Sequence, residues 1–258
     1  MGVCAAAEEG SQLHFCDPQS RKVLDLVNSD TWQGLPITAV GLRLKLALMV
    51  EQAEAPPMKC ISAVKLKSLG PRIPVFSEGH AVDAVEVCEN YGVLIFVSHK
   101  WLQHGLPDDP TDTKAQLLVE WADWYASRYP ARNVYFWIDW CCVDQEQPGP
   151  GIRSLPLYIG ACTDLISIQM GPYRESAWCA VEKVLAFVLL FSGKVPWVIQ
   201  PLEGTCDMRR TASGGSPTEE VVALMDPRCT RRVRVYAFFV FRCNTTTGAL
   251  SLGVALRR

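Results

Sequence analysis

The chain has 258 residues, of which 49% are hydrophobic and 20% are charged, and its formal net charge is -2. This composition is typical of a globular protein with a sizeable core, and it excludes collagen-like and disordered chains. A net charge so close to zero gives no field that would attract nucleic acid or anionic lipid. We therefore expect no nucleic-acid partner.

Cysteine is frequent, but its pattern does not predict a disulfide framework. The 11 cysteines are an odd number, no CxxC pair occurs, and no secretory hydrophobic segment opens the chain. These features favour reduced thiols and a cytoplasmic location. No apolar run reaches the roughly 18 to 20 residues that span a bilayer. Acylation of Gly2 and Cys4 is the one route to a membrane, although Ala6 stands where such sites usually carry Ser or Thr.

The first 90 residues divide into two parts. Residues 1–20 are expected to form a flexible N-terminus, and residues 21–90 an α-rich elaboration or a separate subdomain. Within this second part, Leu42 to Leu46 alternates like a strand while its flanks favour a helix, so its type stays open. Pro56-Pro57 and the segment 70–74 mark connections.

Residues 91–200 alternate apolar strands with helices. Continuous apolar runs at 93–97, 134–138, 165–168 and 195–199 predict strands that are covered on both faces. Helices are expected over 114–128, near 155–162 and over 176–191, the last with Ser176 as its N-cap. This order predicts an α/β fold, a flavodoxin-like three-layer domain with a central, mostly parallel sheet flanked by helices. Residues 201–258 are expected to form a flexible loop and a C-terminal strand, over 233–241, that completes the sheet.

Polar side chains follow the predicted strands. Ser98-His99-Lys100-Trp101 follows the first strand, Asp139 ends the second, and Tyr173-Arg174-Glu175-Ser176 lies beyond the third. Ligands of open α/β sheets bind beyond the carboxyl ends of the strands. Six of the eight tryptophans also lie between Trp101 and Trp178, and an aromatic wall with a few polar groups is typical of a small-molecule site. Trp121 and Trp137 are instead expected in the core.

Glu182 is the most informative single residue. It lies in the second turn of the expected third helix, and its neighbours three and four positions away are Trp178, Cys179, Leu185 and Ala186, none of them cationic. A carboxylate in an apolar stripe is desolvated or faces a cleft, which raises its pKa and suits acid–base or cation-stabilising chemistry. The alternative is that Glu182 points to solvent at the edge of the stripe.

The segment 91–200 resembles a TIR domain. The resemblance rests on Phe96-Val97-Ser98-His99, on Asp139, and above all on Tyr173-x-x-Ser176-x-Trp178-Cys179-x-x-Glu182. The segment Trp137-Ile138-Asp139-x-Cys141-Cys142-Val143-Asp144-Gln145 also resembles HET (heterokaryon-incompatibility) domains, which share the TIR-like fold. The loop Pro107-Asp108-Asp109-Pro110 and the Gly/Pro-rich loop after Gln145 depart from the usual TIR pattern.

The resemblance implies a signalling or innate-immunity domain. In TIR domains that are enzymes, the glutamate of this motif catalyses the cleavage of NAD to nicotinamide and an ADP-ribose product, so Glu182 would be the catalytic carboxylate. NAD or a related nucleotide would be the substrate, and no cofactor is expected. The lining of the site would comprise Ser98, His99, Lys100, Trp101, Asp139, Tyr173, Arg174, Ser176 and Trp178. The alternative is a non-enzymatic module that self-associates, and both readings imply a homo-oligomer.

Two further chemistries stay open. Cys141 or Cys142 could act as a nucleophile with His99 or His104 as its base, although adjacent cysteines after a strand are more often packed in the core. Metal binding by Asp139, Cys141, Cys142 and Asp144 is disfavoured because the spacing is too tight for a standard tetrahedral zinc site. We therefore expect no metal.

Overall fold

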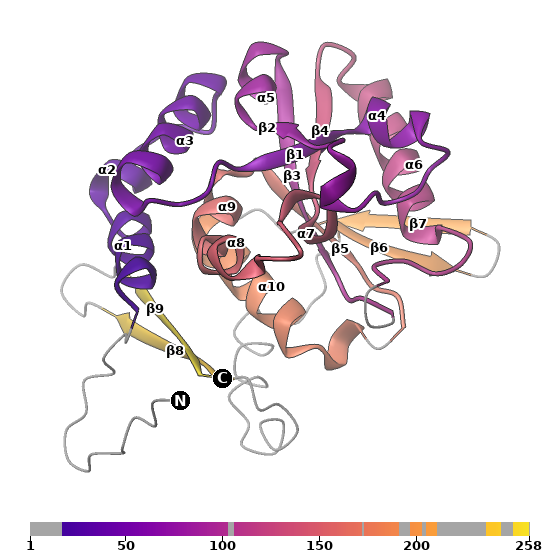
Figure 1. The fold of residues 1–258 in the computed structure, drawn as a ribbon. Coiled ribbons are helices and arrows are strands. Elements are labelled where there is room, and N and C mark those ends of the chain that lie inside the picture. Colours follow the sequence, from indigo (N-terminus) through magenta and orange to yellow (C-terminus); the bar gives the residue numbers. More distant parts are fainter. Residues whose placement is uncertain are drawn as a thin grey trace.

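The computed structural model describes residues 17–102, 106–171, 173–190, 197–202, 205–210, 236–243 and 250–257. Its centre is a seven-stranded sheet with the strand order β2-β1-β4-β3-β5-β6-β7 (Figure 1). The strands are β1 (Lys59–Ser62), β2 (Val82–Asp83), β3 (Gly92–His99), β4 (Asn133–Trp137), β5 (Asp164–Ile168), β6 (Trp197–Leu202) and β7 (Thr205–Arg210). The strands expected near 93, 134 and 165 are confirmed. The fourth begins at Trp197, and the two residues before it lie outside the described part of the chain.

The four central strands are parallel. β3 pairs with β4 and β5, and β5 pairs with β6, all in parallel register. Strands β2, β1 and β7 extend the two edges through antiparallel pairs. In chain order the central strands run 2-1-3-4, which is consistent with a flavodoxin-like kind of fold. The point where this order reverses lies between β3 and β5.

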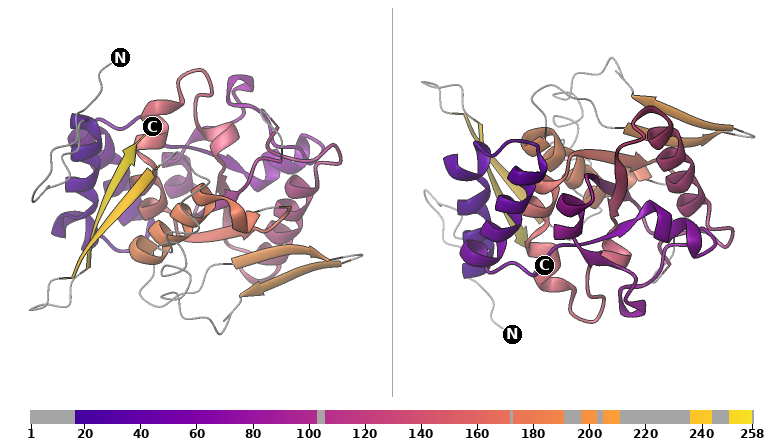
Figure 2. Two further views of the ribbon diagram at one scale, coloured as in Figure 1. Left: turned by 90° about the horizontal axis from the view of Figure 1, so that it is seen from below. Right: turned by 90° about the horizontal axis from the view of Figure 1, so that it is seen from above.

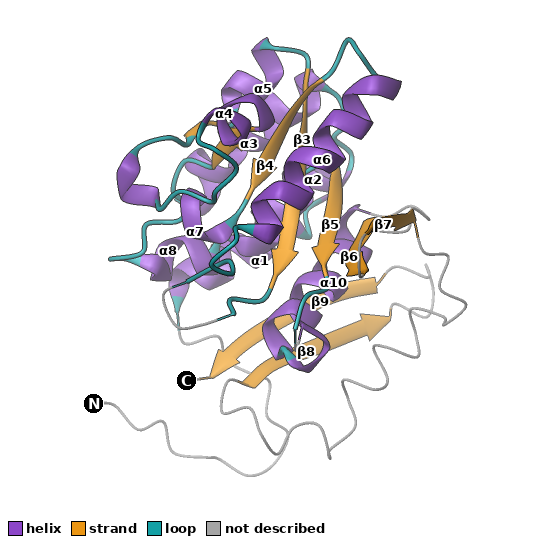
Figure 3. Cartoon of the chain, turned by 90° about the vertical axis from the view of Figure 1, so that its right-hand side faces the viewer, coloured by secondary structure: helices purple, strands orange, loops and turns teal. Residues whose placement is uncertain are grey.

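Helices cover both faces of the sheet. α6 (Thr113–Arg128) and α4 (Ala63–Ser68) pack together against β4 (Figure 3). α9 (Leu155–Ala161) and α10 (Ala177–Leu190) pack together against β3 (Figure 1). Two short helices, α7 (Asp139–Cys142) and α8 (Pro148–Arg153), connect β4 to α9. Trp121 and Trp137 are buried in the core as expected. The apolar runs at 93–97 and 134–138 are therefore explained by burial on both faces.

The N-terminal third belongs to the same sheet. It contains α1 (Pro18–Val27), α2 (Asp30–Gln33), α3 (Ala39–Ala53), the 3-10 helix η1 (Phe76–Glu78) and α5 (Val85–Glu89), in addition to α4, β1 and β2. α1 and α3 pack against α9, on one side of the molecule (Figure 2). β1 pairs with β4, so this segment contributes a strand to the main sheet. The segment 42–46, which alternates like a strand, is helical.

The C-terminal strand lies in a different place from the one expected. β8 (Tyr236–Cys243) pairs with β9 (Leu250–Arg257) in a separate two-stranded sheet and does not join the main sheet. The edge beyond β6 is instead occupied by β7, which follows β6 closely in the chain. A local hairpin closes at a lower entropic cost than a pairing with a strand that lies far along the chain. No helix in the described ranges is long and apolar enough to cross a membrane.

Candidate functional site

Glu182 meets two distant residues where β3 and β5 end. Ser98 of β3 lies beside Ser167 of β5 in the register of the sheet. The chain leaves β3 toward β4 and leaves β5 toward β6, so the two connections diverge and form the switch point at which α/β sheets bind ligands. The Ser98 hydroxyl lies 2.7 Å from Oε2 of Glu182 and 2.7 Å from the Tyr173 hydroxyl. Glu182 therefore lies at the carboxyl ends of the parallel strands, where the sequence predicted a site.

Glu182 is enclosed. Only 2% of its surface is exposed, so the alternative that it points to solvent is wrong. Burial raises the pKa of its carboxyl group well above the usual value. The negative charge of Asp139 acts in the same direction, while hydrogen bonds from Ser98 and Trp178 oppose the rise. The neutral acid is thus the form that this environment favours.

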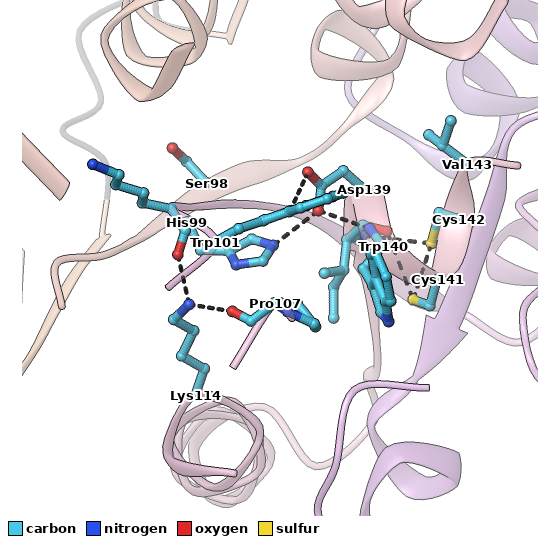
Figure 4. A network of polar contacts seen from close by, with 12 residues as sticks. Ser98, His99, Trp101, Pro107, Lys114, Asp139, Trp140, Cys141, Cys142 and Val143 are labelled. Carbon is cyan, nitrogen blue, oxygen red and sulfur yellow. Dashed lines mark hydrogen bonds and ion pairs between the residues drawn. The ribbon is translucent and has the colours of Figure 1, made fainter. Parts of the chain in front are cut away.

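A second polar cluster surrounds Asp139 (Figure 4). Its Oδ1 lies 2.9 Å from Nε2 of His99 and accepts the backbone N–H of Trp140 at 2.7 Å. Its Oδ2 accepts the indole N–H of Trp101 at 2.9 Å. The rings of Trp101 and Trp140 meet edge to face with centroids 4.9 Å apart. The Asp139 side chain is 24% exposed, so this carboxylate reaches the surface between two indoles.

His99 supplies the buried imidazole ring of this cluster. Its Nδ1 has no hydrogen-bond partner among the residues that the structure describes, whereas its Nε2 contacts Asp139. A contact between a ring nitrogen and a carboxylate oxygen requires a proton on that nitrogen, so we assign the proton to Nε2. An orphaned lone pair on Nδ1 is also less costly to bury than an orphaned N–H.

The two clusters lie on opposite faces of the end of β3. Ser98 and His99 are successive strand residues, so their side chains leave opposite faces of the sheet. On one face Ser98 hydrogen-bonds to Glu182, and on the other His99 hydrogen-bonds to Asp139. The charge of Asp139 nevertheless contributes to the raised pKa of Glu182. The clusters are therefore electrostatically coupled.

The other predicted residues have more varied positions. Trp178 is half-buried and hydrogen-bonds to Glu182. Ser176 caps α10, because its hydroxyl accepts the backbone N–H of Cys179 at 3.3 Å. Arg174 is exposed and donates to Oε1 of Gln169 at 3.3 Å. Trp178 therefore contacts the carboxyl group of Glu182 directly, whereas Ser176 has a structural role as the cap of α10.

The backbone of Lys100 is held by Lys114, and Lys114 in turn contacts Asp108. The sequence does not predict a structural role for either residue. The backbone carbonyl of Lys100 accepts Nζ of Lys114 at 2.6 Å, and the Pro107 carbonyl accepts the same ammonium group. Asp108 accepts the backbone N–H groups of Lys114 and Ala115 at 3.0 and 2.9 Å. Lys114 and Asp108 thus hold the connection after β3 in place. An Asp just before a helix is a recognisable cap signal, but nothing local distinguishes a buried helical lysine from an exposed one.

The geometry does not support a cysteine nucleophile. Sγ of Cys141 lies 3.5 Å from Sγ of Cys142 and 3.7 Å from the Ile138 carbonyl, and both thiols are buried. Burial raises the pKa of the Cys141 thiol, which opposes thiolate formation. The Nε2 of His99 is engaged by Asp139, and His104, the other proposed base, lies outside the described residues.

No metal centre forms in the ranges that the structure describes, where no group of three or more His, Cys, Asp or Glu residues could hold an ion.

A scan against protein-family models, a search of curated proteins and a search of solved structures all found no match for this chain. Its function must therefore be inferred from its residues and their geometry.

Proposed function

We propose that this chain is a TIR/HET-like signalling or defence domain that cleaves NAD, with Glu182 as the catalytic carboxylate. One observation supports this most strongly. Glu182 lies at the switch point of the sheet, 2.7 Å from Ser98 and enclosed by the segment that carries Tyr173. A buried ionisable group with a strongly raised pKa in such a place is a marker of a functional site.

Glu182 would act on the ribose next to nicotinamide. The C–N glycosidic bond breaks, and its electron pair leaves on the ring nitrogen, which makes nicotinamide neutral. The ribose carbon becomes an oxocarbenium-like cation, and water then adds to it and releases a proton. A preorganised carboxylate stabilises this developing positive charge. The cationic nicotinamide ring of bound NAD would itself favour the ionised form of Glu182.

Substrate would reach Glu182 after a local movement. Glu182 and Tyr173 are both almost fully buried. Tyr173 is the first residue of the 3-10 helix η2 (Tyr173–Glu175), a single turn between β5 and α10. Displacing this turn would break the hydrogen bond between Tyr173 and Ser98, and we propose that this movement uncovers the carboxyl group. We infer that self-association into a homo-oligomer favours the open form.

The second candidate is a non-enzymatic self-association module of the same fold. The near-complete burial of Glu182 favours it, because a carboxyl group with 2% exposure contacts no solute in this conformation. Under this alternative Glu182 is an internal packing residue. The free cysteines of the described ranges (Cys60, Cys88, Cys141, Cys142, Cys162 and Cys179) suit a reducing, cytoplasmic location under either candidate.

Nicotinamide release from NAD by the purified full chain at high concentration tests the proposal. The Glu182→Gln variant keeps the shape of the side chain, and Glu175→Gln removes an exposed carboxylate nearby as a matched control. We expect release by the wild type and by Glu175→Gln, and a loss of roughly 100-fold or more in Glu182→Gln. Absence of release from all three, with self-association intact, would support the interaction module.

A further inference from the structure

A pocket of about 340 Å³ lies at the amino-terminal ends of the parallel strands, whereas Glu182 lies at their carboxyl ends. Its floor contains residues at the amino-terminal starts of three parallel strands, namely Val93 of β3, Asp164 of β5 and Trp197 of β6. Its walls come from α3 and from the end of α6. The volume falls within the range of small-molecule sites. None of the residues assigned to NAD cleavage lines it.

Lys45 lines this pocket with a largely buried side chain. It is only 8% exposed, and its Nζ donates to the Gly160 carbonyl at 2.7 Å. The ammonium group also lies 5.1 Å from the centroid of the Trp32 ring. No carboxylate forms an ion pair with it in the described part of the chain. A buried ammonium group without a counter-ion is costly, and burial lowers the pKa of Lys45. A bound anion beside it would favour its charged form.

Further positive potential converges on the same space. Arg132 lines the pocket and forms no ion pair with a described residue. The N-terminus of α3 also borders it, through Thr38 and Ala39, and a helix of 15 residues carries a partial positive charge at that end. One acidic residue, Asp164, also lines the pocket. Its carboxylate accepts the indole N–H of Trp197 at 3.0 Å and the backbone N–H of Leu165 at 2.9 Å, and its charge reduces the positive potential of Lys45 and Arg132.

The rest of the lining combines aromatic and apolar side chains with the polar residues Thr38, Cys162 and Thr163. The rings of Tyr125 and Tyr129 lie 4.7 Å apart, and Trp197, Ile37 and Leu42 complete the wall. Such surfaces bind flat or hydrophobic bodies. We propose that this pocket binds a small organic anion with an aromatic body, whose acidic group lies between Lys45 and Arg132. This site is separate from Glu182 and does not depend on the proposed NAD cleavage.

The proposal can be tested with two fluorescent probes on the full chain. One is 1-anilinonaphthalene-8-sulfonate, an aromatic anion, and the other is N-phenyl-1-naphthylamine, which has the same rings without the charge. The variants are Lys45→Met, Arg132→Gln and, as a control outside the pocket, Lys67→Met, which removes an exposed charge of α4. Circular dichroism and a urea midpoint establish that each variant is folded.

We expect saturable binding of one anionic probe per chain. Its affinity should fall about tenfold in Lys45→Met and in Arg132→Gln, because each change removes a charged partner. It should stay unchanged in Lys67→Met, and the uncharged probe should bind all four proteins equally. Anion affinity that is unchanged in Arg132→Gln, or equal losses for both probes, would overturn the proposal. Arg132 is exposed, so its variant decides the test even if Lys45→Met does not fold.

Discussion

Glu182 is held by a serine hydroxyl and an indole, with no cation bonded to it among the described residues. Burial therefore dominates its electrostatics and keeps its pKa above the ordinary value of 4.5. The folded protein retains this proton when the unfolded chain has already lost it. The contribution of the neutral group to stability is thus fully present below pH 4.5, and it is lost as the pH rises toward the pKa of the folded state.

The Glu182→Gln variant removes this dependence on pH. We expect its free energy of unfolding, relative to the wild type, to increase as the pH rises above 4.5, with a limiting slope of about 1.4 kcal/mol per pH unit, until the pH passes the pKa of Glu182 in the folded state. Urea denaturation at four pH values measures it. Glu175→Gln, at an exposed position, should give a profile parallel to that of the wild type. Parallel profiles for Glu182→Gln as well would show that Glu182 is ionised in the folded protein.

At the residue scale, the sequence predicted the place of Glu182 better than its contacts. The apolar helical neighbours of Glu182 predicted an unusual carboxyl group, and burial confirms this. The contact of Tyr173 with Ser98 could not be predicted, because it depends on how η2 folds back over the end of β3. Lys45 and Leu44 show the limit of hydrophobic patterns: Lys45 is buried, while Leu44 is 48% exposed.

At the scale of single elements, three aspartates lie close to the start of α6 and act on it differently. Asp108 is buried and accepts two backbone N–H groups of the first turn. Asp109 accepts the backbone N–H groups and hydroxyls of Thr111 and Thr113. Burial and the charges of the other two aspartates raise the pKa of Asp112, which adopts a left-handed backbone conformation with φ of 54°. Asp112 therefore adds repulsion without a capping bond.

Two substitutions at these positions should have opposite effects. Asp108→Ala leaves two N–H groups without their acceptor, so we expect a loss of about 1–2 kcal/mol in the free energy of unfolding. Asp112→Asn removes the repulsion and suits the left-handed conformation, so its stability should be equal or higher. Urea midpoints compare the two at neutral pH. Equal destabilisation by both changes would contradict this description of the helix start.

Most elements of the central sheet were predictable because their signals are local. The apolar runs that became β3, β4 and β5 are bounded by polar connections, and α6 has clear helical spacing. The pairing of β1 with β4 and the separate hairpin of β8 and β9 were not predictable. β1 and β4 are far apart in sequence, so their pairing leaves little trace in the local pattern. β8 and β9 lie close together in the chain, but the apolar run of β8 does not show which strand it pairs with.

At the scale of the whole molecule, the N-terminal third completes the core. β1 lies between β2 and β4, and Ile61 and Cys60 are fully buried. α1 and α3 pack against α9, and Lys45 bonds to Gly160. Without the preceding residues, the segment 91–200 would expose the edge of β4 and a face of α9.

Removal of the first 90 residues should therefore prevent folding. We expect this truncated chain to lack a cooperative urea transition, whereas removal of residues 1–16 should preserve every described contact and a normal transition. Circular dichroism during urea titration makes the comparison. A cooperative transition of the shorter chain at the midpoint of the full chain would show that residues 91–258 fold independently.

The most direct test of the proposed site is nicotinamide release from NAD by Tyr173→Phe and by the double variant Tyr173→Phe/Glu182→Gln. The Tyr173→Phe change removes the phenolic hydroxyl and its hydrogen bond to Ser98. In the wild type this hydrogen bond stabilises the closed form by about 0.5–1.5 kcal/mol. Release by Tyr173→Phe should then exceed that of the wild type by roughly twofold to tenfold, and the double variant should release none. Equal release by the two variants, or none by either, would contradict the assignment of Glu182 as a catalytic carboxylate covered by Tyr173.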